Sequence, residues 1–78
     1  MQAGRYSFIA TIQSQGRVNG FGAIAPLFHT EIGIKDVPEG AERSKVELDI
    51  IETAVKAQMR RATTVGGYCV LFLSLNPQ

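Results

Sequence analysis

The chain has 78 residues, and its eight Lys and Arg against seven Asp and Glu give a formal net charge of +1 at pH 7. Hydrophobic residues make up 45% of the chain and charged residues 19%, which excludes a disordered tail and a highly charged nucleic-acid-binding arm. This length predicts one small α/β domain over residues 1–78, a size that often depends on a disulfide, a metal or a partner for stability. With one Cys and one His, we expect no metal and no cofactor, and a protein partner or a self-dimer instead.

The apolar runs of the chain are too short for a membrane protein. The longest, residues 68–73, has six residues, whereas a membrane span needs roughly 20. The first residues lack the charged start and long apolar stretch of a signal peptide. We therefore expect no membrane contact and a cytoplasmic location, with Cys69 as a small buried hydrophobic residue.

The first third of the chain has the pattern of a β-hairpin. Residues 6–12 alternate apolar and polar side chains, which is the period of a half-buried strand. A polar loop follows and ends in Asn19-Gly20, a favourable turn dipeptide because both residues tolerate positive φ. Residues 21–25 then predict the return strand, which Pro26 ends.

A third strand is predicted over residues 30–37. In this segment Ile32 and Ile34 face one way, while Glu31 and Lys35 face the other. The Pro- and Gly-containing turn that follows ends the strand.

The strongest local signal indicates a helix. Ser44 and Glu47 have the spacing of a capping box, in which the two side chains satisfy free N–H groups at a helix start. The helix is predicted over residues 45–62, with an apolar sector along its length, and Gly66-Gly67 stops it.

The last predicted strand, residues 68–73, is apolar on consecutive positions, a pattern typical of a strand buried on both faces. The expected fold is α+β: a single four-stranded mixed sheet in the order β-β-β-α-β, with one helix packed on one face. The crossover through the helix would place the last strand parallel to the first. The opposite face, which includes Ile9, then needs a partner or solvent to cover it.

This order of elements resembles the first half of the ribonuclease H-like fold. Residues 20–24 match the family's Gly-aromatic-Gly-Ala-hydrophobic stretch in the second strand, and Glu47-Leu48 match a Glu-Leu pair in its helix. Residues 70–73 match its apolar fourth strand. The resemblance implies a truncated and catalytically degenerate member of the family.

The metal chemistry of that family does not carry over to this chain. A two-metal nuclease needs several carboxylates, but residues 11–13 contain no acid and Asn76 is an amide. Glu47 alone remains, either as a helix cap or as a carboxylate aimed at a polar partner. A residual metal-dependent nuclease is thus a minor alternative, and we expect no enzyme and no catalytic residues.

A regulator of nucleic acid is the second alternative. The chain resembles HicB-like antitoxins in length, strand order and single helix. Arg60 and Arg61 are the candidate nucleic-acid-binding residues, but acids are interspersed among the bases, and strong non-specific binding needs a clustered positive field. Nucleic acid is therefore a less favoured partner.

Four residues are candidates for protein binding. Leu27 and Phe28 lie in an expected strand connection, where two large apolar residues are unusual. Ile9 lies on the uncovered sheet face and Arg17 in the hairpin loop. The leading expectation is a non-catalytic protein-binding module, an inhibitor or regulator of a host protein complex that resembles small phage-encoded or mobile-element inhibitors such as anti-CRISPR proteins.

Overall fold

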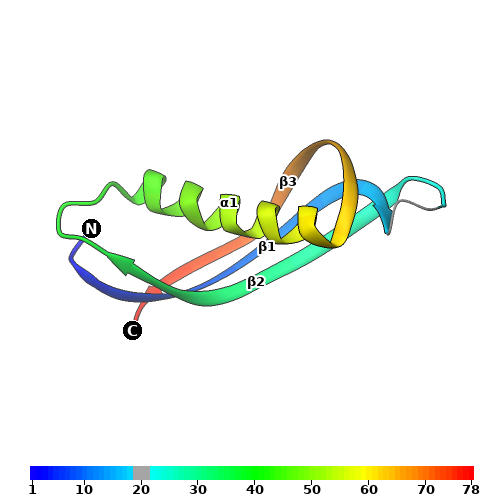
Figure 1. Ribbon diagram of the computed structural model, residues 1–78. Coiled ribbons are helices and arrows are strands. Elements are labelled where there is room, and N and C mark those ends of the chain that lie inside the picture. The colour runs from blue at the N-terminus through cyan, green and yellow to red at the C-terminus, as the bar shows by residue number, and fades with distance from the viewer. Residues whose placement is uncertain (19–21) are drawn as a thin grey trace.

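The computed structural model of the chain describes residues 1–18 and 22–78, which form three β-strands and one α-helix (Figure 1). In chain order the elements are β1 (Gly4–Val18), β2 (Ala25–Val37), α1 (Arg43–Arg61) and β3 (Ala62–Pro77). The helix lies along one face of the sheet, and the β1–β2 hairpin extends beyond the end of the helix (Figure 1).

The sheet has the order β2-β1-β3 with antiparallel neighbours, so β1 is central and β2 and β3 are its edges. The expected four-stranded mixed sheet is wrong, because the described residues form three strands in the order β-β-α-β. One strand fewer precedes the helix, which reverses the direction of the strand after it. As a result β3 runs antiparallel to β1, where the sequence predicted a parallel pair.

The missing strand results from a continuous β2. The predicted strand 30–37 begins earlier and includes Pro26, which was expected to end the preceding strand. Pro26 is the second residue of an edge strand, a position where Pro is tolerated because its missing N–H removes no ladder bond when it faces solvent. Of the predicted return strand 21–25, the last residue belongs to β2 and the first lies outside the described residues, as does the predicted Asn19-Gly20 turn.

The resemblance to the ribonuclease H-like fold is wrong. A three-stranded antiparallel sheet with one helix replaces the four-stranded sheet of that resemblance. Residues 22–24 of the matched motif belong to the connection between β1 and β2, outside any strand. The strand order that also suggested a HicB-like antitoxin is not the observed one.

The core lies between β1 and α1. β1 alternates buried and exposed residues, which confirms the predicted period of two, although the strand is 15 residues long and continues past the predicted end at residue 12. The two edge strands add only Val37 and Leu75 to the buried cluster. The buried apolar residues of β1 are Tyr6, Phe8, Ala10 and Ile12.

Two glycines allow close approaches across the sheet. A Cβ atom on Gly16 would collide with the backbone carbonyl oxygen of Thr63 in β3, so this position excludes any side chain. A Cβ atom on Gly33 in β2 would lie 2.8 Å from the Phe8 ring, which fills the space that the glycine leaves. Gly16 thus allows the backbone of β3 to approach β1, and Gly33 leaves room for the Phe8 side chain.

The helix begins at Arg43 rather than at Lys45 as predicted, and it ends at Arg61. Its N-cap is Glu42, without a side-chain cap hydrogen bond, so the predicted capping box of Ser44 and Glu47 is wrong. The Glu47 carboxylate instead lies 3.5 Å from Nε of Arg43, one turn earlier. The buried face of the helix packs on the sheet and includes Val46, Ile50, Ala54 and Ala57 of the predicted apolar sector, whereas Leu48 and Met59, which the prediction also placed in that sector, are exposed.

The helix continues directly into β3 without a connecting loop. Ala62 caps the helix in an extended conformation and is also the first residue of the strand. The predicted stop signal, Gly66-Gly67, lies inside β3 at an irregularity in its pairing with β1. Gly66 has a φ of 74°, a left-handed conformation that favours glycine.

The fold is elongated for its length. Its extents are 46 × 18 × 17 Å and its radius of gyration is 14.1 Å, compared with about 11.5 Å expected for a compact domain of this size. The narrow sheet therefore exposes more surface along its length than a rounded domain would.

Candidate protein-binding surface

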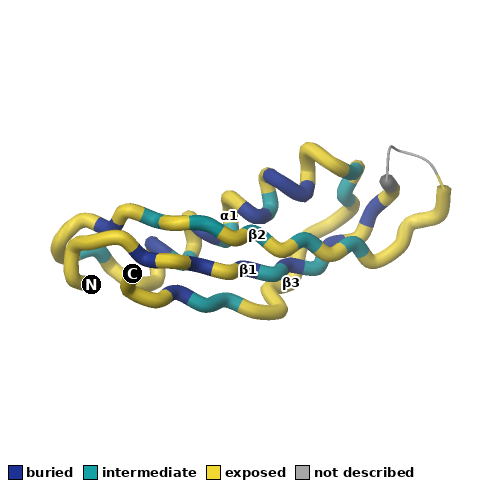
Figure 2. Tube along the Cα trace, turned by 90° about the horizontal axis from the view of Figure 1, so that it is seen from below, coloured by how far each residue is buried: buried dark blue, intermediate teal, exposed yellow. Residues whose placement is uncertain are grey.

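β2 carries three large apolar side chains, Phe28, Ile32 and Ile34, on the face turned away from the helix, whereas Leu27 and Val37 lie on the helix side. Ile32 and Ile34 point away from α1, while Glu31 and Lys35 lie on the helix side opposite buried residues of β1. Figure 2 views the molecule from the sheet side and shows half-buried and exposed residues alternating along β2. A half-buried strand normally turns its apolar side toward the core, so this pattern is inverted. We call the sheet face opposite α1 the open face.

The large apolar residues of the open face lie on all three strands around the central Thr11–Thr30 pair. Ile9 lies directly across from Ile32, and these side chains are 39% and 71% exposed. Phe28 lies further along β2 on the same face. Phe72 of β3 also lies on this face, where it is the pairing partner of Thr11. Taken with typical residue areas, these side chains together expose roughly 500 Å², within the range of the largest patches found on monomers. The open-face cluster consists of Ile9, Phe28, Ile32, Ile34 and Phe72.

The polar groups in the middle of the open face are uncharged. The hydroxyls of Thr11 and Thr30, which face each other across β1 and β2, are hydrogen bonded at 2.9 Å. The Arg5–Asp36 ion pair, 3.3 Å long, lies at one end of the face and Arg17 lies near the other end. Between these ends, the described strand residues that point to the open face include no charged side chain.

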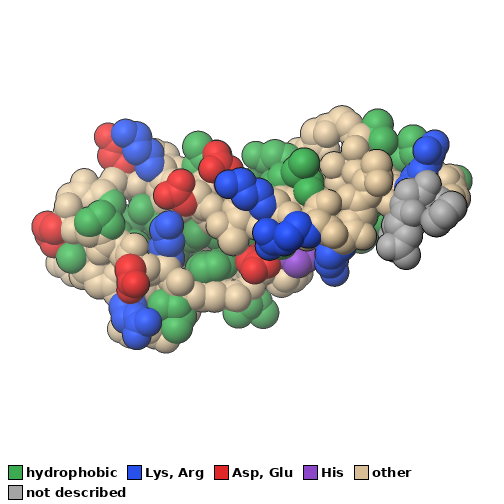
Figure 3. Space-filling model, in the orientation of Figure 1, with side chains coloured by type: hydrophobic (Ala, Val, Ile, Leu, Met, Phe, Trp, Pro, Cys, Tyr) green, Lys and Arg blue, Asp and Glu red, His purple; other side chains and the backbone are tan. Residues whose placement is uncertain are grey.

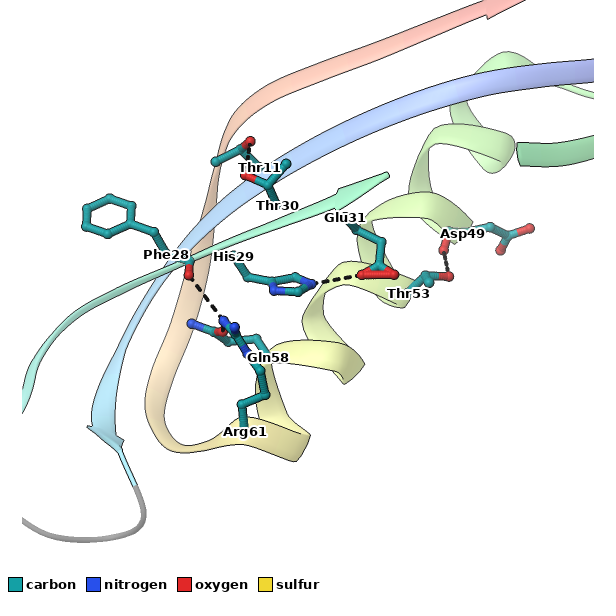
Figure 4. Close-up of polar contacts among 9 residues, drawn as sticks. All are labelled: Thr11, Phe28, His29, Thr30, Glu31, Asp49, Thr53, Gln58 and Arg61. Atoms are coloured by element: carbon teal, nitrogen blue, oxygen red, sulfur yellow. Dashed lines mark hydrogen bonds and ion pairs between the residues drawn. The ribbon is translucent and has the colours of Figure 1, made fainter. Parts of the chain in front are cut away.

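The helix side of β2 holds the charged groups instead (Figure 4). Nε2 of His29 lies 2.8 Å from Oε2 of Glu31, and both side chains are largely shielded by the helix. Nζ of Lys35 lies 3.6 Å from Oδ2 of Asp49 on α1. The Lys35–Asp49 pair joins the polar flank of the helix to the edge strand, whereas the His29–Glu31 contact lies within β2.

The end of the helix is tied to β1 and β2 by a short chain of hydrogen bonds. Nη2 of Arg61 donates to the carbonyl oxygen of Phe28 at 3.3 Å and to Oε1 of Gln58 at 2.7 Å. The buried Gln58 in turn donates from Nε2 to the hydroxyl of Ser14 at 3.3 Å. Figure 4 shows the Phe28 ring pointing away from this network. The backbone of Phe28 is thus held by the helix while its ring stays exposed.

The predicted protein-binding residues do not form one site. Ile9 and Phe28 both belong to the open-face cluster, whereas Leu27 points to the helix side, opposite Ser14. Arg17 is exposed near the far end of β1 and lies opposite Thr63. Leu27 and Phe28 are in a strand rather than in a connection, so alternation places them on opposite faces.

The two predicted nucleic-acid-binding arginines differ in their surroundings. Both are exposed at the end of α1, but Arg61 makes the hydrogen bonds described above, which gives it a structural role. Figure 3 shows acidic and basic side chains interspersed over the visible face rather than gathered in one basic field.

Three members of the open-face cluster, Ile32, Ile34 and Phe72, are not among the binding candidates predicted from the sequence. The alternation of Ile32 and Ile34 with charged residues is visible in the sequence, but the sequence does not indicate which side of this strand faces the core. Only the pairing register with β1 shows that the apolar side faces outward.

The described parts of the chain contain neither a cluster of metal ligands nor a membrane-spanning helix. Within residues 1–18 and 22–78, no three His, Cys, Asp or Glu residues gather where they could hold a metal ion. In the same residues, no helix is long and apolar enough to cross a membrane.

Comparisons of this chain with protein-family models, with curated proteins and with solved structures give no match.

Proposed function

We propose that this chain is a non-catalytic protein-binding module whose open face packs against an apolar helix of a different protein. The observation that supports this most is the inverted pattern of β2, which leaves Ile32 71% exposed beside Ile9 and turns Lys35 toward the helix. Apolar surface gains about 25 cal/mol per Å² when it leaves water, so a cluster of this size favours burial in a complex.

The dimensions of the open face fit one partner helix. The outer strands of a three-stranded sheet lie about 10 Å apart, which equals the diameter of one helix with its side chains. From Phe28 to Ile34 the apolar side of β2 extends about 20 Å, the length of nearly four helical turns. The partner helix would lie on the open face as α1 lies on the other, giving three layers.

The partner surface should be apolar and uncharged in its centre. A charged centre would lose water against the open-face cluster without finding an opposite charge, which is unfavourable. The Arg5–Asp36 pair at one end offers charges only at the rim of such a contact. This electrostatic pattern also favours protein over nucleic acid, whose phosphates need a basic surface.

A small inhibitor or regulator would act by covering such a helix on a larger protein. An inhibitory or regulatory role is proposed because the chain is small and its sequence carries no catalytic motif. The cytoplasmic location predicted from the sequence stays a prediction.

The test compares affinity capture by three forms of the full chain from cells that naturally produce it. The native chain and Leu48→Lys should retain the same partner, because Leu48 is an exposed residue of α1 away from the open face. Ile32→Lys should lose at least nine tenths of that partner, because a charge then lies in the centre of the contact. Capture that is equal for all three forms, or that shows no partner dependent on Ile32, would overturn the proposal.

A further inference from the structure

The edge strand β3 has the sequence pattern of a central strand. Residues 68–73 are apolar on consecutive positions, yet β3 lies at the edge of the sheet, and five of these six residues are exposed. None of the 16 residues of β3 is charged. By contrast, the other edge strand, β2, carries Glu31, Lys35 and Asp36. Proteins commonly use charged residues to keep edge strands from pairing with other chains, and β3 lacks this protection.

The backbone of β3 presents free hydrogen-bonding groups along this edge. The N–H of Gln78 donates to the carbonyl oxygen of Arg5 at 2.9 Å, so Arg5 of β1 and Gln78 form a hydrogen-bonded pair beside the β1–β3 ladder. By the antiparallel alternation, the N–H and C=O groups of Leu73 and Leu75 then point away from β1. The outward carbonyl oxygen of Leu75 accepts from Nη2 of Arg43 at 3.5 Å, which partly covers that end of the edge.

The exposed side chains beside this edge are also apolar. Tyr68 and Val70 lie on the helix side, and Met59 of α1 lines the same groove as Tyr68. Leu71 is the extra residue where the pairing register with β1 shifts, and it is 51% exposed. Together with Phe72, these residues expose roughly 500 Å². The backbone of the strand adds to this area, and a standard interface buries about 800 Å² on each partner.

We propose that two copies of this chain form a dimer by antiparallel pairing of their β3 strands. A two-fold axis perpendicular to the sheet near Leu71 would bring the same edge of each copy together, as an isologous interface requires. The pairing would make one six-stranded sheet in which β3 is central on both copies, which accounts for its apolar pattern. Since β3 is uncharged and the chain carries a net charge of +1, repulsion between the copies is small.

The shape of the chain favours a second copy beside β3. The elongated fold, 46 Å long and 18 Å wide, removes the most surface when a second copy lies along its length. The axis keeps both helices on the same face, so the groove between Met59 and Tyr68 of each copy would be closed by the other. The two open faces would form one continuous face of double width. This dimer does not depend on the proposed partner helix.

The test measures the mass of the full chain in solution by size-exclusion chromatography with light scattering over a range of concentrations. The native chain should have twice its single-chain mass of 8.5 kDa. Leu71→Lys should have the single-chain mass, because the two-fold axis places the two new charges close together. Leu48→Lys is the matched control, since Leu48 is 49% exposed and lies on α1, and it should stay dimeric.

Hydrogen exchange of the native chain supplies a second readout that needs no variant. The outward N–H of Leu73 should be protected at high concentration and should exchange at least tenfold faster when the dimer is diluted apart. A single-chain mass at high concentration, a Leu71→Lys chain that stays dimeric, or fast exchange of Leu73 within a dimer would each overturn the inference. Capture of an extended peptide of another protein by monomeric native chain would assign the edge to that peptide instead. Ile32→Lys should keep the dimer mass, which separates this result from a failure of the partner-helix proposal.

Discussion

Ile9 of β1 and Ile32 of β2 lie directly across from each other on the sheet face that α1 leaves uncovered. On β1 the residues flanking Ile9 are buried beneath the helix, whereas on β2 the residues flanking Ile32 are Glu31 and Gly33. Apart from Ile9, the apolar side chains of residues 6–12 of β1 therefore face the helix, whereas Ile32 and Ile34 of β2 face away from it. The fold uses the apolar side of β1 for its core and leaves Ile32 and Ile34 of β2 exposed.

This relationship predicts that Ile32 contributes little to the stability of the isolated chain. Ile32→Ser should change the free energy of unfolding by less than about 0.5 kcal/mol, because the side chain is 71% exposed before the substitution. Urea denaturation of the native chain and the variant measures this difference. A loss of more than about 1.5 kcal/mol would place Ile32 in the core and would contradict the open face. Both proteins should be compared at one concentration, so that self-association is the same.

The opposite result is predicted for Ile50 in the middle of α1. Ile50→Ala should destabilise the chain by about 2–5 kcal/mol, because it leaves a cavity between the helix and the central strand. Leu48→Ala, on the exposed side of the same helix, should cost less than about 1 kcal/mol. Thermal unfolding followed by circular dichroism measures both. Similar losses for the two variants would mean that the helix packs in another orientation.

Gly16 provides a test of the pairing between β1 and β3. Gly16→Ala should destabilise the chain by about 2–3 kcal/mol, because the added methyl group meets the rigid backbone of Thr63. The control is Gly67→Ala, where an added Cβ atom meets no other atom within 4 Å, and its effect should stay below about 1 kcal/mol. Urea denaturation again provides the measurement. Equal stability of the Gly16→Ala and native chains would contradict this register.

The two arginines at the end of α1 should behave differently. Arg61→Ala should cost about 0.5–1.5 kcal/mol, because it removes hydrogen bonds to the Phe28 carbonyl and to Gln58. Arg60→Ala should have an effect within about 0.5 kcal/mol, since Arg60 makes no hydrogen bond or ion pair with the described residues. Equal effects of the two substitutions on the free energy of unfolding would show that the network does not stabilise the helix end.

The sequence pattern predicted correctly those elements that bury one face and expose the other. Residues 6–12 and the helix both bury one face, so their periods of 2 and 3.6 residues were visible without a structure. The helix start was placed too late, because Ser44 and Glu47 have capping-box spacing but Glu42 caps the helix through its backbone. Local signals could not decide between these two starts.

The predicted number of strands was wrong because proline and apolar runs are less reliable indicators in edge strands than in central strands. Pro26 was interpreted as a strand end, but at the edge of the sheet a strand continues through it. The consecutive apolar residues 68–73 predicted burial on both faces, but among the described residues only Leu73 packs against the core, and the other five, including Cys69, which was expected to be buried, are exposed. For this segment and for the apolar side of β2, the sequence pattern matches an assembly better than the isolated chain.

The burial of the open face inside cells is the claim on which the proposed function depends. Carbene footprinting of the chain measures it directly, by comparing the labelling of Ile32 and Phe28 in the purified protein and in the cells that produce it. We expect labelling of both residues to fall at least fivefold in cells, while the exposed Leu48 on the helix is labelled equally in both samples. Equal labelling of Ile32 and Phe28 in the two samples would show that no partner covers the open face, and it would contradict the proposed function.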